Sequence, residues 1–179
     1  MKSKSLKTPL RYPGGKSRAC TKIESYFPDL SEYKEYREPF LGGGSVALYV
    51  TQKFPHLKVW VSDLYEPLIN FWQVLQKEGN TLSNALIKLK NKYPDQESAR
   101  RLFLDTKDMI NDEHYADIDR AIAFYIVNKC PFSGLTEASS FSKQASDSNF
   151  TIRGLEKLPE YSLSLIHISE PTRQAEISY

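Results

Sequence analysis

The first part of the chain alternates between short hydrophobic stretches and amphipathic ones, which predicts alternating strands and helices. Aromatic or alternating apolar positions indicate strands, and apolar side chains three or four residues apart indicate helices. We expect strands over 33–40 and 56–62 and helices over 17–27, from Ser45, and over 63–76, the last one closing near Gly79. This order predicts an α/β fold built on a doubly wound parallel sheet.

The pattern becomes helical beyond residue 79. Apolar side chains recur at helical spacing over 81–93, 95–110 and 115–130. A polar, serine-rich stretch over 133–150 predicts an exposed hairpin or loop, and a short helix is expected over 151–158. We therefore expect an α/β half over 1–78 and a mostly helical insertion with a hairpin over 79–158.

The composition of the chain argues against several classes of protein. Hydrophobic residues make up 40% of the chain and charged residues 26%, as in an ordinary globular domain. No apolar run reaches the roughly 18 residues of a membrane span, and no apolar run follows the basic N-terminus, so we expect no signal peptide and a cytoplasmic protein. The isolated residues Cys20, Cys130, His56, His114 and His167 lack the spacing of disulfide scaffolds or metal sites. The net charge of +2 neither requires nor excludes nucleic acid as a partner.

The last part of the chain looks foreign to the rest. Residues 163–173 read LSLIHISEPTR, which resembles the translation of a common sequencing adapter. On this interpretation the natural sequence ends near Ser162, and residues 163–179 are an artefactual tail. The alternative is a native strand, SLSLIHIS, followed by a polar tail.

The strongest chemical signal is the glycine run at Gly42, Gly43 and Gly44, placed between an expected strand and an expected helix. Glycines let the backbone turn tightly and let a ligand approach, and the helix N-terminus beyond them offers free N–H groups. The alternative is a flexible connector in which Ser45 caps the helix.

A carboxylate follows the glycine run at the spacing of a nucleoside-binding fold. Asp63 comes 19 residues after Gly44, at the end of the second expected strand, where a carboxylate can accept hydrogen bonds from ribose hydroxyls. The alternative is a capping box, in which Asp63 and Glu66 together cap the next helix. The spacing from the glycine run favours ribose binding.

The residues alone leave the identity of the cofactor open. The strict dinucleotide motif GxGxxG is absent, but its relaxed form is met by Gly42, Gly44 and Ala47, so NAD is not excluded. Leu10 stands where a P-loop needs glycine, which argues against a nucleoside triphosphate. S-adenosylmethionine is a candidate because its carboxylate requires a cation such as Lys16.

Four blocks, taken in order, resemble the motifs of the Dam-type (D12 class) DNA adenine N6-methyltransferases. They read LRYPGGK at 10–16, EPFLGGGSV at 38–46, SDLYEPLIN at 62–70 and NKCPFSGL at 128–135. The resemblance implies a partial Rossmann-like, S-adenosylmethionine-dependent methyltransferase sheet whose helical insertion recognises the target. It also implies S-adenosylmethionine as cofactor, double-stranded DNA as partner and a monomeric enzyme. The joint match, rather than the glycine loop, favours S-adenosylmethionine over NAD.

The resemblance also implies roles for single residues. Tyr12 would pack on the cofactor, Lys16 would hold its carboxylate, Phe40 would line its methionine side, the backbone at Gly42 and Gly44 would approach it, and Asp63 would bind its ribose. The DNA-binding residues would be Arg11, Asn128, Ser133 and Glu137.

The chain departs from the family pattern in two places. Members that read GATC place an arginine four residues after the position of Ser133, where this chain has Glu137, so GATC specificity is not expected. The Asp-Pro-Pro-Tyr motif is absent from the sequence, so we assign no catalytic residue and expect an inactive N-terminal fragment. The alternatives are a truncated product that binds DNA or cofactor without turnover, and an NAD-dependent Rossmann enzyme.

Overall fold

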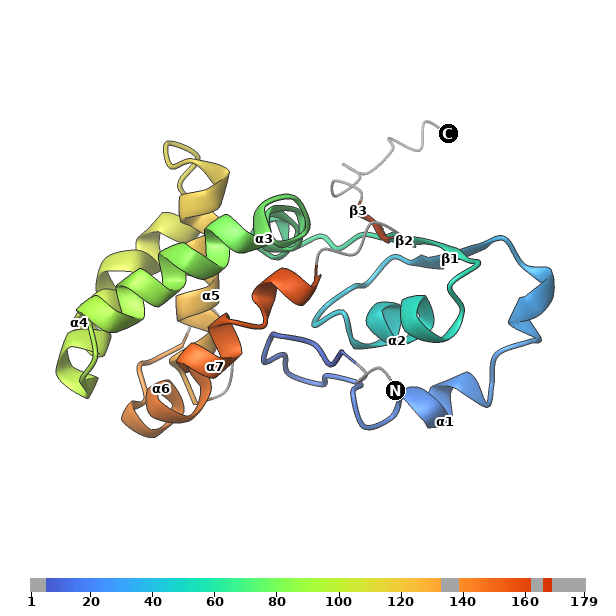
Figure 1. The fold of residues 1–179 in the computed structure, drawn as a ribbon, viewed down its shortest axis with the longest axis horizontal. Helices are drawn as coiled ribbons and strands as arrows, with labels where there is room; N and C mark the ends of the chain where they lie inside the picture. The colour runs from blue at the N-terminus through green and yellow to red at the C-terminus, as the bar shows by residue number, and fades with distance from the viewer. Residues whose placement is uncertain (1–5, 133–138, 162–165, 169–179) are drawn as a thin grey trace, which may run out of the picture.

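The computed structural model describes residues 6–132, 139–161 and 166–168. The α-helices are α1 (Cys20–Glu24), α2 (Ser45–Lys53), α3 (Glu66–Lys92), α4 (Gln96–Lys107), α5 (Asp117–Lys129), α6 (Lys143–Asn149) and α7 (Ile152–Leu155). The 3₁₀ helices are η1 (Leu30–Glu32), η2 (Asp108–Asn111) and η3 (Leu158–Tyr161). Figure 1 shows the sheet and α2 on one side of the molecule and helices α4 to α7 on the other. The mixed α/β class expected from the sequence is confirmed.

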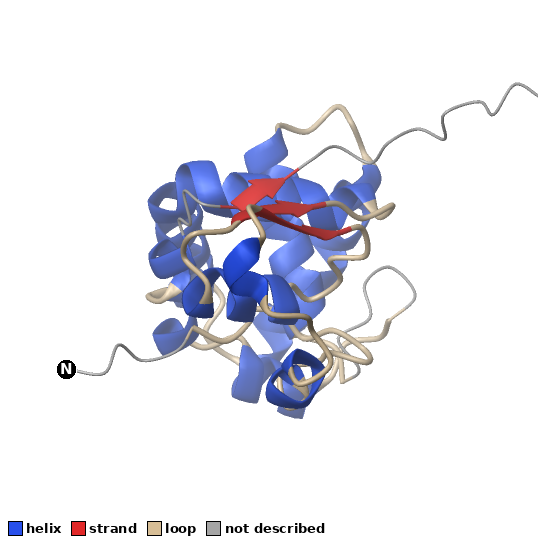
Figure 2. Ribbon diagram, turned by 90° about the vertical axis from the view of Figure 1, so that its right-hand side faces the viewer, coloured by secondary structure: helices blue, strands red, loops and turns tan. Residues whose placement is uncertain are grey.

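The sheet is small and parallel. Its strands are β1 (Glu35–Glu38), β2 (Lys58–Val61) and β3 (Ile166–Ile168), in the spatial order β1-β2-β3. Figure 2 shows the three strands side by side among the helices. Val59 and Val61 of β2 are buried while Lys58 is exposed, so the alternation in the sequence marks the face that packs on the core. The expected strands over 33–40 and 56–62 were placed correctly but are four and three residues longer than β1 and β2.

Strand β3 lies within the segment for which an artefactual tail and a native strand were the two interpretations. Ile166 and Ile168 pair in parallel with Val59 and Val61 of β2. The ring of His167 stacks on Trp60 with centroids 4.5 Å apart. The remaining residues of the tail, 163–165 and 169–179, lie outside the described part of the chain.

The helix expected to close near Gly79 is interrupted at the neighbouring residue. Over Glu66–Lys92, α3 joins two helical segments across a kink at Glu78, where φ is −131° and the backbone is not helical. Gly79 itself lies against η3, where a Cβ would meet the Cα of Pro159 at 3.4 Å, an ordinary van der Waals contact. The kink falls at the expected boundary between residues 78 and 79, with one segment of α3 on each side of it.

Packing of α3 against α5 forms the centre of the helical half. The ring of Phe71 on α3 lies 5.4 Å from Phe124 and 5.8 Å from Tyr125 on α5, and all three side chains are buried. One cluster of buried apolar side chains continues from here to the strands. Hydrophobic burial on this scale stabilises the two halves as one unit. No helix in the described ranges is both long and apolar enough to cross a bilayer.

The segment expected to be an exposed hairpin or loop is partly helical. Ser142 caps α6 by accepting from the Ala145 N–H, and Phe150 is buried at its end. An antiparallel bridge between Pro131 and Phe141 closes the base of the segment, as a hairpin would. The prediction was wrong for 143–149 because a short serine-rich helix with few apolar residues has little periodicity to detect.

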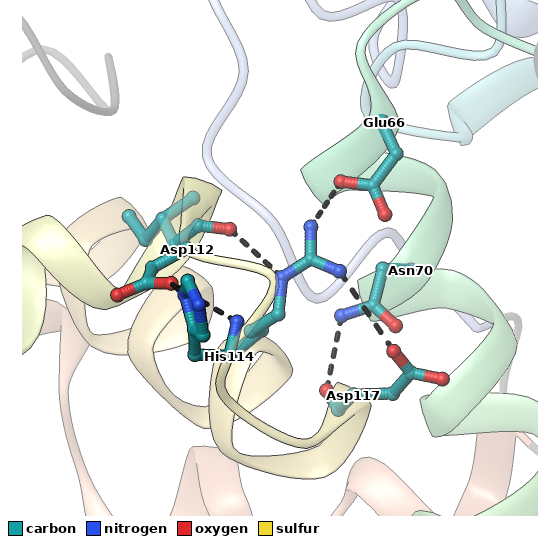
Figure 3. Close-up of polar contacts among 7 residues, drawn as sticks. Glu66, Asn70, Asp112, His114 and Asp117 are labelled. Carbon is teal, nitrogen blue, oxygen red and sulfur yellow. Dashed lines mark hydrogen bonds and ion pairs between the residues drawn. The ribbon is translucent and has the colours of Figure 1, made fainter.

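A buried arginine, Arg120 on α5, joins the start of α3 to the helical insertion. Figure 3 labels Glu66, Asn70 and Asp117, which take part in the polar contacts here. The guanidinium of Arg120 on α5 donates to the Glu66 carboxylate, and its Nε donates to the carbonyl of Ile110 at 3.2 Å. Asn70 on α3 donates to the backbone carbonyl of Asp117 at 3.0 Å. The first turn of α3 is therefore held from the side by α5 and η2.

Replacing Arg120 with alanine should lower the free energy of unfolding by about 2 kcal/mol, because it leaves the Ile110 carbonyl unpaired and removes buried packing. Glu66 contributes little to this cost, since its side chain is 44% exposed and can return to water. Urea unfolding followed by circular dichroism measures the change. The matched control is Arg101→Ala on the exposed face of α4, which should change stability by less than about 0.5 kcal/mol. Equal effects of the two substitutions would contradict the role assigned to Arg120.

Candidate functional site

A pocket of about 440 Å³ opens at the carboxyl end of β1. Its wall is made by the N-terminal turn, by α1 and by the loop between β1 and α2. The expected cofactor residues among its lining are Tyr12, Lys16, Phe40 and Gly42. Ligand sites of α/β proteins form beyond the carboxyl ends of parallel strands, and this volume lies in the usual range for small ligands.

The glycine run is a packed turn and not a flexible connector. Gly42 and Gly44 have φ values of 50° and 68°, which favour glycine. A Cβ on Gly42 would lie 3.1 Å from Cε1 of Tyr12, and a Cβ on Gly44 would lie 2.6 Å from Cζ2 of Trp72. The loop is therefore held between two aromatic rings. Gly44 does not line the 440 Å³ pocket but faces a small apolar cavity beside Trp72.

Ser45 does not cap the helix. Helix α2 begins at Ser45 itself, and Gly44 occupies the N-cap position without a side-chain cap. The Ser45 hydroxyl lies 2.9 Å from that of Ser17, which links the helix start to the N-terminal segment.

Asp63 connects the loops that follow the two strands. Its Oδ2 accepts the Gly42 N–H at 2.8 Å, and its Oδ1 accepts the Tyr65 N–H at 3.1 Å. The capping-box alternative is wrong, because α3 begins at Glu66 without a side-chain cap and the Glu66 carboxylate is bound to Arg120. Asp63 thus lies beside the pocket through its contact with Gly42.

The aromatic and cationic side chains of the pocket have defined positions. Tyr12 lies against the glycine loop, and burial together with the negative charge of Asp63 raises the pKa of its hydroxyl. The ammonium of Lys16 donates to the carbonyl of Gly14 at 2.6 Å, which leaves two of its three N–H groups for a ligand. Phe40 is 77% exposed and offers an apolar surface at the pocket wall.

The sequence analysis missed Glu38 as a residue of the pocket. Its carboxylate lines the cavity at the end of β1, where it accepts from the backbone N–H of Ala47 and from the Tyr36 hydroxyl at 3.4 Å. Burial outweighs these two interactions and raises the pKa of Glu38 to about 7. The available signal was its position, since Glu38 ends a strand immediately before the glycine loop.

The expected DNA-binding residues divide into three cases. Asn128 is 1% exposed, and its amide accepts the Arg11 N–H at 2.9 Å and donates to the Arg11 carbonyl at 2.7 Å. It therefore positions the N-terminal segment and presents no surface to DNA in this conformation, contrary to the expectation. The Arg11 guanidinium donates to the carbonyls of Pro131 and Phe132. Ser133 and Glu137 lie outside the described residues.

Within the described ranges, no three His, Cys, Asp or Glu side chains are grouped so that they could hold a metal ion.

Gly44→Ala should lower the free energy of unfolding by about 3 kcal/mol, because it combines a left-handed backbone with overpacking against Trp72. Gly79→Ala is the control, since a Cβ there meets its nearest neighbour at 3.4 Å. The control should be neutral, or stabilising by up to about 1 kcal/mol, because alanine favours the helix. Both variants are compared by chemical denaturation. A neutral Gly44→Ala would show that the loop is not held as described.

Glu38 should make the protein less stable as the pH rises. The pKa of this carboxyl is raised from 4.5 to about 7 in the folded state, so its contribution to stability is complete below pH 4.5 and is lost between pH 4.5 and 7. Glu38→Gln removes this dependence, and the exposed Glu32→Gln serves as control. Unfolding midpoints at pH 5 and 7.5 should therefore show Glu38→Gln gaining stability relative to wild type at the higher pH. If the stability difference between Glu38→Gln and the wild type were the same at pH 5 and at pH 7.5, the prediction would be refuted.

Relatives of known function match most of this chain but only part of their own lengths. The chain is 31% identical over 137 residues to the type II methyltransferase M.MjaIII of Methanocaldococcus jannaschii, which covers 73% of the chain and 47% of that protein. It is 32% identical over 126 residues to the DNA N-6-adenine-methyltransferase of Escherichia phage P1, covering 70% of the chain and 15% of the relative. A DNA adenine methylase of Vibrio cholerae is 28% identical over 126 residues, covering 70% of the chain and 42% of the relative.

The match to a family is broader than the match to any of these relatives. Residues 12–169 match the D12 class N6 adenine-specific DNA methyltransferase family, so the match includes the glycine loop, Asp63 and the helical insertion. The chain spans less than half the length of each of the three relatives. The pocket geometry, the order of the four motifs and this match agree, and the chain belongs to the D12 class of N6 adenine-specific DNA methyltransferases.

Proposed function

We propose that the pocket at the end of β1 binds S-adenosylmethionine, and that the protein serves methyl transfer to N6 of adenine in double-stranded DNA as a cytoplasmic monomer. The observation that supports this most directly is that a cation and a carboxyl group line the same cavity. Lys16 and Glu38 both line it, beside a glycine loop tied to Asp63. S-adenosylmethionine carries a carboxylate, an ammonium and a sulfonium next to a ribose. Its pocket therefore needs both a cationic and an acidic side chain in its lining.

The residues fit the parts of this cofactor one by one. Lys16 would bind the carboxylate with its two remaining N–H groups, and Glu38 would bind the ammonium. A nearby cation stabilises the charged form of Glu38, so binding lowers its raised pKa. Asp63 keeps acceptor capacity on both oxygens for the ribose hydroxyls, because each accepts one backbone N–H. Tyr12 and Phe40 supply apolar surface.

The structure also offers an argument against NAD. A dinucleotide places its pyrophosphate at the N-terminus of the helix that follows the glycine loop. In this protein the Glu38 carboxylate already accepts the backbone N–H of Ala47 in the first turn of α2. A pyrophosphate there would meet a carboxylate in a partly buried site, and this repulsion opposes binding.

Methyl transfer needs more than the cofactor. The sulfonium supplies an electrophilic methyl group, but the adenine amino group is a poor nucleophile until the base is extruded and its N–H groups are accepted. The Asp-Pro-Pro-Tyr string to which the family resemblance assigns that task is absent from these 179 residues. We therefore propose that the 179 residues bind cofactor and DNA without completing the transfer.

Thermal melting with each cofactor tests the proposal. S-adenosylmethionine at 100 times its Kd should stabilise the protein by about 2.7 kcal/mol, and NAD should not. Lys16→Met should lose most of this effect, while Lys22→Met on the exposed face of α1 should retain it. Stabilisation by NAD alone would overturn the assignment of the cofactor. Incubation with methyl-labelled cofactor and duplex DNA should leave the DNA unlabelled, and labelled adenine would refute the absence of turnover.

A further inference from the structure

A second and larger cleft of about 860 Å³ lies across the N-terminal segment from the cofactor pocket. It is formed by the N-terminal segment, the end of α5, the end of α6, α7 and η3. Four basic side chains line it: Lys7, Lys129, Arg153 and Lys157. Glu160 is the single carboxylate among the residues that line it. The cofactor function does not use this cleft.

The four cations are available to a ligand. Lys7, Arg153 and Lys157 are exposed, and none of the four forms an ion pair with another described residue. Lys129 is half-buried, with its ammonium 5.2 Å from the ring centroid of Tyr125. Burial and the nearby charge of Arg11 lower the pKa of Lys129 to about 8. Unbalanced positive charge in a partly buried cleft is relieved when an anion enters.

The cleft and the cofactor pocket are both lined by the N-terminal segment of the chain. Residues 6–9 line the cleft and residues 12–16 line the pocket, so the two rims are joined by the three residue steps from Pro9 to Tyr12. Three residues of fully extended chain span at most about 11 Å.

That backbone is also fixed in place. The Tyr161 hydroxyl donates to the Lys7 carbonyl at one end, and Asn128 holds Arg11 by two hydrogen bonds at the other. The positive cleft is thus held at a set distance from the pocket.

We propose that this cleft binds the phosphate backbone of the duplex whose adenine receives the methyl group of the cofactor in the neighbouring pocket. The proposal rests on the proposed function and adds where the duplex lies. Lysine and arginine without exposed aromatic platforms are suited to phosphates and not to stacked bases. A duplex also presents several phosphates at short spacing, which matches several separate cations better than a single small anion does.

The experiment is the salt dependence of DNA binding, measured by fluorescence anisotropy with a labelled duplex. Each neutralised phosphate contributes about 0.9 to the slope of log K against log salt. The double variant Arg153→Gln, Lys157→Gln should therefore reduce the slope by about 1.8 and weaken binding at low salt by at least about tenfold. The matched control, Lys88→Gln with Arg101→Gln, removes the same charge from exposed positions outside the cleft and should keep the wild-type slope.

Melting with S-adenosylmethionine separates this proposal from the function it rests on. The cleft variant should retain the full cofactor stabilisation, because none of its changed residues lines the cofactor pocket. Three outcomes would overturn the assignment of the cleft to DNA: a wild-type slope in the cleft variant, an equal loss of slope in the control, or no DNA binding by the wild type. If cofactor stabilisation persists in any of these cases, the cofactor assignment remains and only the DNA assignment is rejected.

Discussion

The hydrogen bond from the Gly42 amide to the Asp63 carboxylate is the contact on which the rest of the site depends. It joins the loop after β1 to the loop after β2, so it holds together two segments that lie 21 residues apart in sequence. On one side of the bond, Tyr12 lies against the glycine turn and lines the pocket. On the other, the chain enters α3 and reaches the helical insertion through Glu66 and Arg120.

The contact between the glycine loop and Asp63 was predictable because its signals in the sequence are local. Glycines at a strand-to-helix turn and a carboxylate after the next strand must meet once the two strands pair in parallel, since both loops then lie at the same end of the sheet. Glu38 was missed because its part in the pocket depends on burial, which one sequence does not display. The break near Gly79 was predictable, because a glycine inside a helical pattern often marks the end of a helix, and α3 is kinked at Glu78.

Asn128 shows a different limit of sequence reasoning. Within its motif it looked like a residue for reading DNA, yet both ends of its amide are bound to the backbone of Arg11, 117 residues earlier. Only the tertiary structure reveals such a long-range contact. The contact also explains how the start of the chain can lie between a basic cleft and the cofactor pocket, even though residues 6–19 contain no helix or strand.

Helix α3 has a consequence for protein engineering. Enzymes with interchangeable recognition modules are usually recombined at the apparent border between domains, which here would be residue 78. That border coincides with the kink of α3 at Glu78, but the segment before it packs on α5 of the helical half through Phe71 and Glu66. Chimeras joined there would replace one side of this interface and keep the other. Exchange of specificity between relatives should instead carry α3 together with α5, with the junction placed before Glu66.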